Sequence, residues 1–208
     1  PERQGDEEIA DGEAERHPSV WRMATQLARI EQADTTVVQV AALLHDIADW
    51  KFHAGNADAG AQAARAWLTA HLAPAELVEH VCEIIHGVTF KGAGVPTPMR
   101  TIEGRIVQDA DRLDALGAIG IARAFAYGGA KGQPLHDPSA PPVLHASFEH
   151  YQQHRGSTLN HFYEKLLLLA DRMQTAAARR IAEERTQFMR EFLTRFKQEW
   201  SADLERPC

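Results

Sequence analysis

The segment TTVVQVAALLHDIAD, residues 35–49, constrains the fold more than any other part of this sequence. On a helical wheel its apolar side chains cover most of the circumference, so other elements should enclose the predicted helix on nearly all sides. However, His45, Asp46 and Asp49 fall together on one arc of about 100° of the same wheel. Because an ionised carboxylate is costly to bury without compensation, something positive should face this arc.

A divalent metal ion bound by His45 and Asp46 would supply that positive charge. Imidazole and carboxylate ligands suit manganese, which we expect first, and also magnesium, iron, cobalt, nickel or zinc. A cysteine-rich zinc site is excluded because the chain holds only Cys82 and Cys208. Alternatively, the acids pair with arginines while His45 is hydrogen-bonded inside the core.

A second group of acids lies in RIVQDADRLDALGAIGIAR, residues 105–123, whose apolar residues share one face of a predicted helix. On the wheel, Asp109 and Asp111 lie about 200° apart and cannot reach the same point, so helical geometry does not choose between them. As an alternative to a site, these acids could form surface pairs with Arg105 and Arg112. The acids of this helix are Asp109, Asp111 and Asp114.

The rest of the chain also has helical periodicity and shows no alternating strand pattern, which predicts an all-α fold. Each predicted helix is bounded by Gly, Pro or an Asp, Asn or Thr residue, as helix ends usually are. A chain of 208 residues with 44% hydrophobic residues can bury a core of this kind. We expect helices at about 18–30, 35–49, 58–72, 74–86, 101–115, 117–127, 157–169 and 175–200.

The last predicted helix is long and amphipathic, and its apolar stripe packs either on its own domain or on a second copy in a homodimer. Two stretches rich in Gly and Pro, residues 87–100 and 128–148, predict either functional lids and binding loops or plain surface excursions. The stripe of the last helix comprises Ile181, Phe188, Phe192, Phe196 and Trp200.

The net charge of −7 is concentrated at the start of the chain, where residues 1–16 hold seven acids and two arginines. We expect this segment to be a mobile tail and residues 17–208 to form one domain. Because no basic stripe is present, polymeric DNA or RNA is not an expected partner. No stretch approaches the about 20 apolar residues of a membrane helix, and no secretion signal is evident, which predicts a cytoplasmic protein without membrane contact.

Three segments together carry a resemblance: AALLHDIADWKFH, IVQDADRLDALGAIGIARAFAYGGAKG and HFYEKLLLLADRMQTAAARRIAEERTQFMREF. They resemble the HD-domain metal-dependent phosphohydrolases, and one bacterial-type subgroup in particular. The resemblance implies a helical bundle whose metal is bound by His45, Asp46 and Asp111, the last because it matches the Asp of the family's AD-x-L pattern. It also implies that Asp49, with Asp46, assists the attacking water or the leaving group.

The first histidine of the family's pattern is displaced in this sequence. The family usually has H-x-x-R-V-W, whereas this chain reads ERHPSVW, so that the expected position falls on Arg16 and Ser19 replaces the motif's arginine. Either the start of the helix is rearranged so that His17 still binds the metal, or this ligand is lost. In the second case water or His86 could take the vacant coordination position.

Further candidates for substrate binding lie close to these motifs in the sequence. His86 ends a predicted apolar helix, with Gly87 as its expected cap, and either caps that helix or contacts substrate in the pocket. Lys51, Lys91 and Arg100 could hold phosphate oxygens, or could be ordinary surface cations.

The resemblance implies hydrolysis of a phosphate ester or anhydride in a small nucleotide-like molecule, such as a nucleoside mono- or triphosphate, by a metal-activated water. Two other classes of function remain open. The altered ERHPSVW segment could mark a degenerate protein that senses nucleotides without hydrolysing them. Alternatively, the cluster could bind two irons and support oxidation by O₂, which needs more ligands than His45, Asp46 and Asp111 supply.

Overall fold

The computed structural model describes residues 16–48, 58–88, 93–144 and 156–201, with residues 16–18 described by backbone alone. Every regular element in these ranges is a helix and none is a strand, which confirms the all-α prediction. None of the described helices is both long enough and apolar enough to cross a membrane. The helices are α2 (Arg16–Ile30), α3 (Thr35–Leu44), α4 (Ala59–Ala70), α5 (Ala75–Val88), α6 (Ile102–Asp114), α7 (Gly117–Ala130), α9 (Thr158–Glu164) and α10 (Ala176–Trp200), with 3₁₀ turns η2 (Leu166–Leu168) and η3 (Ala170–Arg172).

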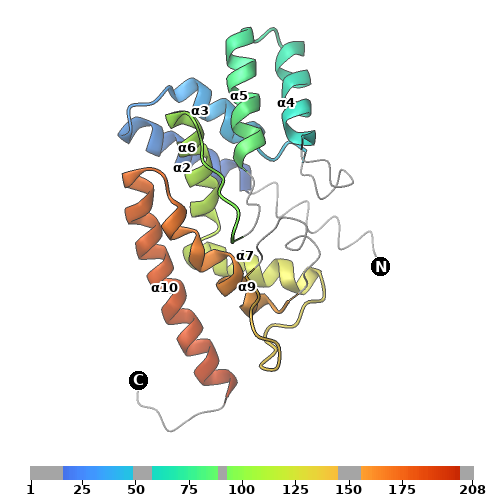
Figure 1. Cartoon of the computed structure of the whole chain (residues 1–208), viewed down its shortest axis with the longest axis vertical. Coiled ribbons are helices and arrows are strands. Elements are labelled where there is room, and N and C mark those ends of the chain that lie inside the picture. The colour runs from blue at the N-terminus through green and yellow to red at the C-terminus, as the bar shows by residue number, and fades with distance from the viewer. Residues whose placement is uncertain (1–15, 49–57, 89–92, 145–155, 202–208) are drawn as a thin grey trace.

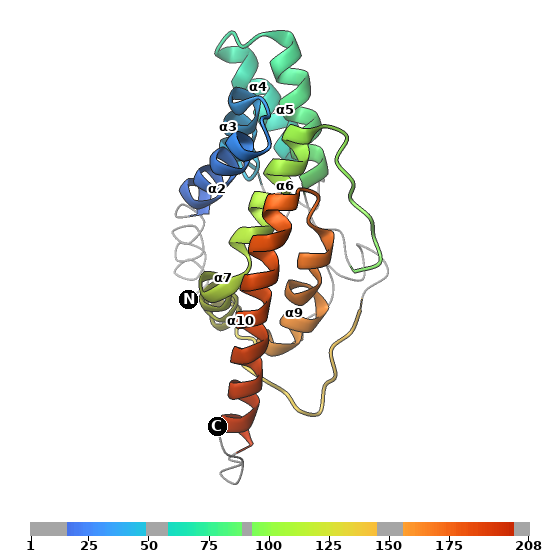
Figure 2. The same ribbon diagram turned by 90° about the vertical axis from the view of Figure 1, so that its left-hand side faces the viewer.

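Helix α6 lies where two groups of helices meet (Figure 1). On one side it packs against α2, α3 and α5, while α4 pairs with α5. On the other side it packs against α7 and α10, and α9 contacts α7. Figure 2 shows the two groups one above the other along the long axis of the molecule. A single hydrophobic core runs through both groups and includes Ile106 and Leu113 of α6, which are fully buried.

Side-chain caps fix the starts of several helices close to where the sequence predicts them. The Asp34 carboxylate accepts hydrogen bonds from the backbone N–H groups of Thr36 (2.8 Å) and Val37 (3.2 Å) at the start of α3. Hydroxyl groups cap three other helices in the same way. They belong to Thr101 for α6, Ser157 for α9 and Thr175 for α10.

The predicted helix over 35–49 ends earlier than expected, at Leu44. Residues 45–48 form a turn, in which the Ile47 N–H donates to the Leu44 carbonyl at 3.1 Å. The expectation that the helix is enclosed on nearly all sides was also wrong, because Leu43 is 50% exposed and Ile47 is 39% exposed. His45 and Asp46 therefore lie in the turn that follows the regular helix, although the backbone of His45 keeps helical angles, with φ of −61° and ψ of −30°.

The predicted helix over 157–169 is broken at Lys165, whose φ of −139° and ψ of −62° are not helical. The 3₁₀ turns that follow α9 bury Leu166, Leu167 and Leu169. A straight helix would distribute the four consecutive leucines around its circumference and expose some of them. The break is therefore explained by the apolar contacts of this leucine run.

The long C-terminal helix is confirmed and packs on its own domain, but its apolar stripe is narrower than predicted. Phe192 and Phe196 contact Phe125 of α7, with ring centroids 5.9 and 5.8 Å apart. Phe188 is 49% exposed and Trp200 is 48% exposed. The buried side of α10 is completed by small and flexible residues that the aromatic stripe did not predict, among them Ala178, Ala182, Met189 and Leu193.

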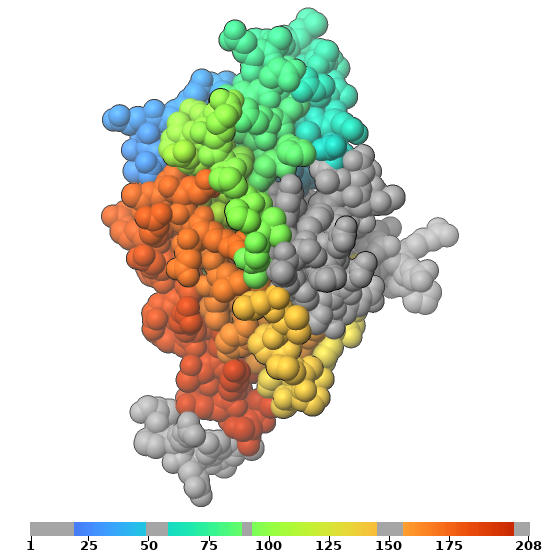
Figure 3. All heavy atoms as spheres, viewed as in Figure 1, coloured from blue at the N-terminus to red at the C-terminus, as the bar shows by residue number. Residues whose placement is uncertain are grey.

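The nine described residues that precede α6, residues 93–101, form a turn at 93–94, an irregular stretch at 95–99 and a bend at 100–101. We call this segment the strap. Figure 3 shows it in green at the surface, beside the orange C-terminal part of the chain. Its inner end is fixed by Met99, which is 7% exposed and packs against Gly87 and Gly104.

Substitution of Gly120 should test the tight corner between α6 and α7. A Cβ at this position would clash with the Ala115 carbonyl oxygen, which is backbone and cannot rotate away. We expect Gly120→Ala to lower the free energy of unfolding by about 1–3 kcal/mol, measured by urea titration. Gly129→Ala in the same helix is the matched control, since no heavy atom lies within 4 Å of its added Cβ. It should be neutral or stabilise by up to about 1 kcal/mol, and equal losses in both variants would contradict this account.

Candidate active site

His45 is buried at the end of α3 with its two ring nitrogens in different environments. The Nδ1 atom lies 2.8 Å from the Ala42 carbonyl oxygen, a hydrogen bond that requires the proton on Nδ1. The Nε2 atom faces two carboxylates, with 3.2 Å to Asp46 Oδ2 and 3.7 Å to Asp111 Oδ1. The carbonyl thus orients the ring so that Nε2 is the nitrogen that can bind a cation.

The packing of α3 against α6 brings His45 and Asp46 together with Asp111, which is 65 residues further along the chain than Asp46. The side chain of His45 is 1% exposed, whereas those of Asp46 and Asp111 are 27% and 20% exposed. The cluster therefore has a buried imidazole on one side and carboxylates within reach of solvent on the other. This is an arrangement that a small ligand can approach.

Charge balance in this cluster depends on a positive partner for the two acids. Burial by itself lowers the pKa of His45, but hydrogen bonds and charge interactions with Asp111 and Asp46 outweigh it and raise the pKa to about 10. Without another cation, the imidazole therefore holds a proton between the carboxylates. One imidazole and two carboxylates are also a donor set that suits divalent manganese, iron, cobalt or zinc.

The three side chains fit a metal in their chemistry, but they do not form a complete coordination sphere. In the described ranges, no group of three or more His, Cys, Asp or Glu side chains has the arrangement of a metal site. Further ligands would have to come from water, substrate or residues outside these ranges. The side chain of His17, in the first turn of α2, lies outside the described residues.

Asp109 and Asp111 have different roles on α6. Asp109 is fully buried and accepts hydrogen bonds from the Gln174 N–H (2.9 Å), the Thr175 N–H (2.8 Å) and the Thr175 hydroxyl (2.8 Å). Burial raises the pKa of Asp109, and these hydrogen bonds oppose that effect. Asp109 thus holds the start of α10, whereas Asp111 faces His45.

The alternative of surface pairs within α6 was wrong. Arg112 is buried, and its guanidinium donates to the Arg172 carbonyl and to Thr97. Arg105 donates to the Met99 carbonyl. Asp114 instead pairs with Arg123 of α7.

His86 contacts an acid outside the His45 cluster. Its Nδ1 atom is 2.8 Å from Oδ1 of Asp58, and both side chains are half exposed. Gly60, two residues after Asp58, packs against the turn of residues 45–48, since a Cβ there would lie 3.4 Å from the Ala48 carbonyl oxygen. The sequence did not single out Asp58; its position at the start of the helix predicted over 58–72 was the available signal.

The expected cap of the helix before the strap was wrong, because α5 continues to Val88 and Gly87 lies inside it. Arg100 pairs with Glu83 at 2.6 Å on the surface. The other sequence candidates, Asp49, Lys51 and Lys91, lie outside the described residues.

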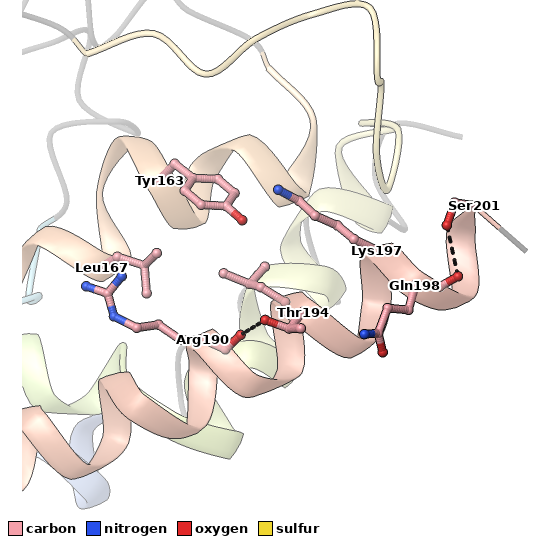
Figure 4. A pocket seen from close by; sticks show the side chains of 8 residues that line it. Tyr163, Leu167, Arg190, Thr194, Lys197, Gln198 and Ser201 are labelled. Atoms are coloured by element: carbon pink, nitrogen blue, oxygen red, sulfur yellow. Dashed lines mark hydrogen bonds between the residues drawn. The ribbon is translucent and has the colours of Figure 1, made fainter. Parts of the chain in front are cut away.

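A groove of about 460 Å³ lies between α9 and α10, apart from this cluster. Figure 4 shows Tyr163 and Lys197 facing each other across it, with the lysine Nζ 4.7 Å from the ring centroid. Arg190 lines the same groove. None of the candidates predicted from the sequence lines this groove, so it does not belong to the candidate active site.

The pH dependence of stability in metal-free protein should report the charge on His45. Because the pKa of His45 is raised from 6.5 to about 10 on folding, its stabilising charge is fully present below pH 6.5 and is lost as the pH rises toward 10. With EDTA present, we expect the free energy of unfolding to fall by several kcal/mol over this range, relative to His45→Gln. Urea titrations of both proteins measure it, and parallel curves would show that His45 is not charged in the fold.

Comparison with known proteins places this arrangement in a family. A family model described as HD domain matches residues 17–116, from the first turn of α2 to just beyond α6. The match therefore covers the helices that carry His45, Asp46 and Asp111.

Three relatives extend the similarity over most of the chain. The uncharacterized protein YpgQ of Bacillus subtilis strain 168 is 36% identical over 179 residues, covering 85% of this chain and 78% of YpgQ. The alignment with the crystal structure of YpgQ in complex with ADP covers 88% of this chain and 87% of the YpgQ chain, with 34% identity and a TM-score of 0.68.

A crystal structure from Lactobacillus plantarum is 39% identical with a TM-score of 0.80, covering 90% of this chain and 86% of that chain. An HD-superfamily hydrolase from Bacillus thuringiensis is 41% identical with a TM-score of 0.67, covering 90% of this chain and 85% of that chain. From these matches and the helical arrangement, the chain has the fold of the HD-superfamily hydrolases and belongs to the HD-domain family.

Proposed function

We propose that this protein is a metal-dependent phosphohydrolase that cleaves a phosphate ester or anhydride of a nucleotide. The observation that carries the proposal is the position of His45 Nε2 beside the carboxylates of Asp46 and Asp111. Two acids and an orienting imidazole, partly open to solvent, are suited to a divalent cation and an anionic substrate. The proposal for a nucleotide is supported by the crystallisation of the related YpgQ with ADP.

The metal ligands in this proposal are His45, Asp46, Asp111 and His17. A divalent metal, manganese first, would supply Lewis acidity, which polarises a phosphoryl oxygen and makes a water molecule acidic enough to attack at neutral pH. The Ala42 carbonyl keeps the proton of His45 on Nδ1, so that Nε2 presents its lone pair.

Other residues of the chain would position the water and the substrate. Asp49, three residues after Asp46, is proposed to orient the attacking water or to act as general acid and base. His86 is proposed to contact the substrate, with Asp58 fixing its ring through the 2.8 Å contact at Nδ1. Lys51 and Lys91 are proposed to hold phosphate oxygens, since a flexible ammonium group can follow a phosphate through several positions.

A nucleotide panel tests this function. The full chain is incubated with Mn²⁺ and nucleoside mono-, di- and triphosphates, and the release of phosphate and of pyrophosphate is measured separately. We expect turnover of at least one nucleotide. His45→Ala, Asp46→Ala and Asp111→Asn should each lower it by more than about a hundredfold, because changes to groups that merely orient ligands already cost about 10- to 100-fold.

Asp171→Asn is the matched control for Asp111→Asn, because Asp171 is an exposed acid in η3. It should retain the wild-type rate. Absence of turnover with every nucleotide, together with unchanged metal binding by Asp46→Ala, would refute the proposal. Tight nucleotide binding without turnover would instead indicate a nucleotide sensor, and two irons per chain with visible absorbance would indicate an oxygenase.

The displaced first histidine has its own test, in metal affinity and not in activity. If His17 is a ligand, His17→Ala should weaken Mn²⁺ binding by about tenfold or more, measured by isothermal titration calorimetry. Arg16→Ala, one residue earlier, is the matched control and should be nearly silent. A large loss in Arg16→Ala with His17→Ala unaffected would overturn the assignment of His17.

A further inference from the structure

The ion pair between Asp114 and Arg123 lies one helical turn from the candidate metal ligand Asp111. Asp114 is the last residue of α6, and side chains three positions apart are neighbours on a helix, with Cβ atoms about 5–6 Å apart. Oδ1 of Asp111 is 3.7 Å from His45 Nε2, and Oδ2 of Asp114 accepts a hydrogen bond from Nη1 of Arg123. The guanidinium of Arg123 is therefore joined to the His45 cluster through neighbouring side chains of one helix.

The helical wheel of α6 places this ion pair on the same side as the cluster. Asp111 and Asp114 lie about 60° apart on the wheel. Asp109, which binds the start of α10, lies about 140° or more from both. Arg123 thus brings positive charge to the side of α6 that carries Asp111.

The tight corner between α6 and α7 fixes the position of Arg123. Figure 1 shows α7 just below the end of α6, and the two helices are in contact. Gly120 of α7 lies so close to the Ala115 carbonyl oxygen that a Cβ there would clash. Arg123 follows Gly120 by three residues on the same face of α7, so this close approach brings its guanidinium to Asp114. Backbone packing, and not a flexible loop, therefore sets where Arg123 lies.

The two partners of the ion pair differ in their exposure to solvent. The side chain of Asp114 is 5% exposed, whereas that of Arg123 is 29% exposed and that of Asp111 is 20% exposed. The buried acid holds the guanidinium, while part of the cation, like Asp111, lies within reach of a solute. A guanidinium has five N–H donors in a planar fork, enough to bind a carboxylate and a phosphoryl group together.

A phosphate group bound at this cluster needs hydrogen-bond donors in addition to a metal. The carboxylates of Asp46 and Asp111 are acceptors, and Nε2 of His45 presents a lone pair when the proton is on Nδ1. Bidentate pairs between arginine and phosphate are among the strong, charge-assisted hydrogen bonds. Arg123, held one turn from Asp111, meets this need.

We propose that Arg123 binds phosphoryl oxygens of the substrate, and that Asp114 is the positioning residue that orients its guanidinium. This inference rests on the proposed function and adds to it a substrate-binding residue from α7. Because its contact is with phosphate, Arg123 should govern affinity for the phosphoryl part of a nucleotide and leave metal affinity nearly unchanged.

The test compares Arg123→Gln with the wild-type full chain by isothermal titration calorimetry. Binding of ADP and of inorganic pyrophosphate is measured with Mn²⁺ present, and binding of Mn²⁺ is measured alone. We expect the affinities for ADP and pyrophosphate to fall by about tenfold or more, with Mn²⁺ affinity within about threefold of wild type. Arg65→Gln is the matched control, because Arg65 of α4 forms the same kind of ion pair with Glu79 of α5. It should leave all three affinities unchanged.

A double variant separates the loss of a phosphate ligand from a loss of stability. Arg123→Gln removes the cation that pairs with the buried Asp114, which should lower the free energy of unfolding. Adding Asp114→Asn removes the acid's charge, so we expect the urea midpoint to recover while ADP affinity stays low. Recovery of ADP affinity together with stability would overturn the inference, because the pair would then be structural.

The positioning role of Asp114 predicts the opposite sign from simple electrostatics. Removing an acid should by itself strengthen the binding of an anion. If Asp114 orients Arg123, Asp114→Asn alone should instead weaken pyrophosphate binding by about threefold or more. Tighter pyrophosphate binding in this variant would show that Asp114 does not position Arg123.

The remaining outcomes distinguish this inference from the proposed function, because binding does not require turnover. A wild-type protein that binds ADP and pyrophosphate without hydrolysing any nucleotide would refute only the proposed function. Unchanged affinities in Arg123→Gln would refute only the inference, as would a loss confined to ADP with pyrophosphate unaffected. A wild-type protein that binds neither ligand would also refute the inference.

Discussion

Hydrogen bonds from the backbone of Gln174 and Thr175 to the Asp109 carboxylate tie the start of α10 to the middle of α6. Asp109 is fully buried, so these donors are what compensate its carboxylate for the loss of water. The same contacts fix the orientation of α6 about its own axis. Because Asp111 follows two residues later, about 200° further round the helix, a helix held by Asp109 on one side presents Asp111 on the other.

The candidate active site depends on that orientation. His45 keeps helical backbone angles at the end of α3, and its ring meets the carboxylates of Asp46, in the following turn, and of Asp111 on α6. The buried imidazole is held by the Ala42 carbonyl, and its other nitrogen meets two partly exposed acids. Groups that are rigid on the protein side and open on the solvent side are suited to binding a cation together with an anionic substrate.

The strap is also held rigidly. It lies in the Gly- and Pro-rich stretch of residues 87–100, for which the sequence did not decide between a lid, a binding loop and a surface excursion. The described part of it is fastened by Arg112 and Arg172 at inward positions, while prolines occupy outward ones. Helix α6 thus connects three features of the fold. The helix carries Asp111, which faces His45, Asp109, which is buried and holds the start of α10, and Arg112, which holds the strap.

The sequence by itself determined the helical class, the helix starts and the residue types of the site. Helix starts were predictable because caps such as Asp34 and Thr175 act on donors two or three residues away. The ends at Leu44 and Glu164 were not, because they depend on contacts with distant parts of the chain. Helical geometry could not choose between Asp109 and Asp111, and only the resemblance to a family selected Asp111. The tertiary structure separated the two acids, since the neighbour that each one meets is set by the packing of α6 against α3 and α10, and not by any local pattern.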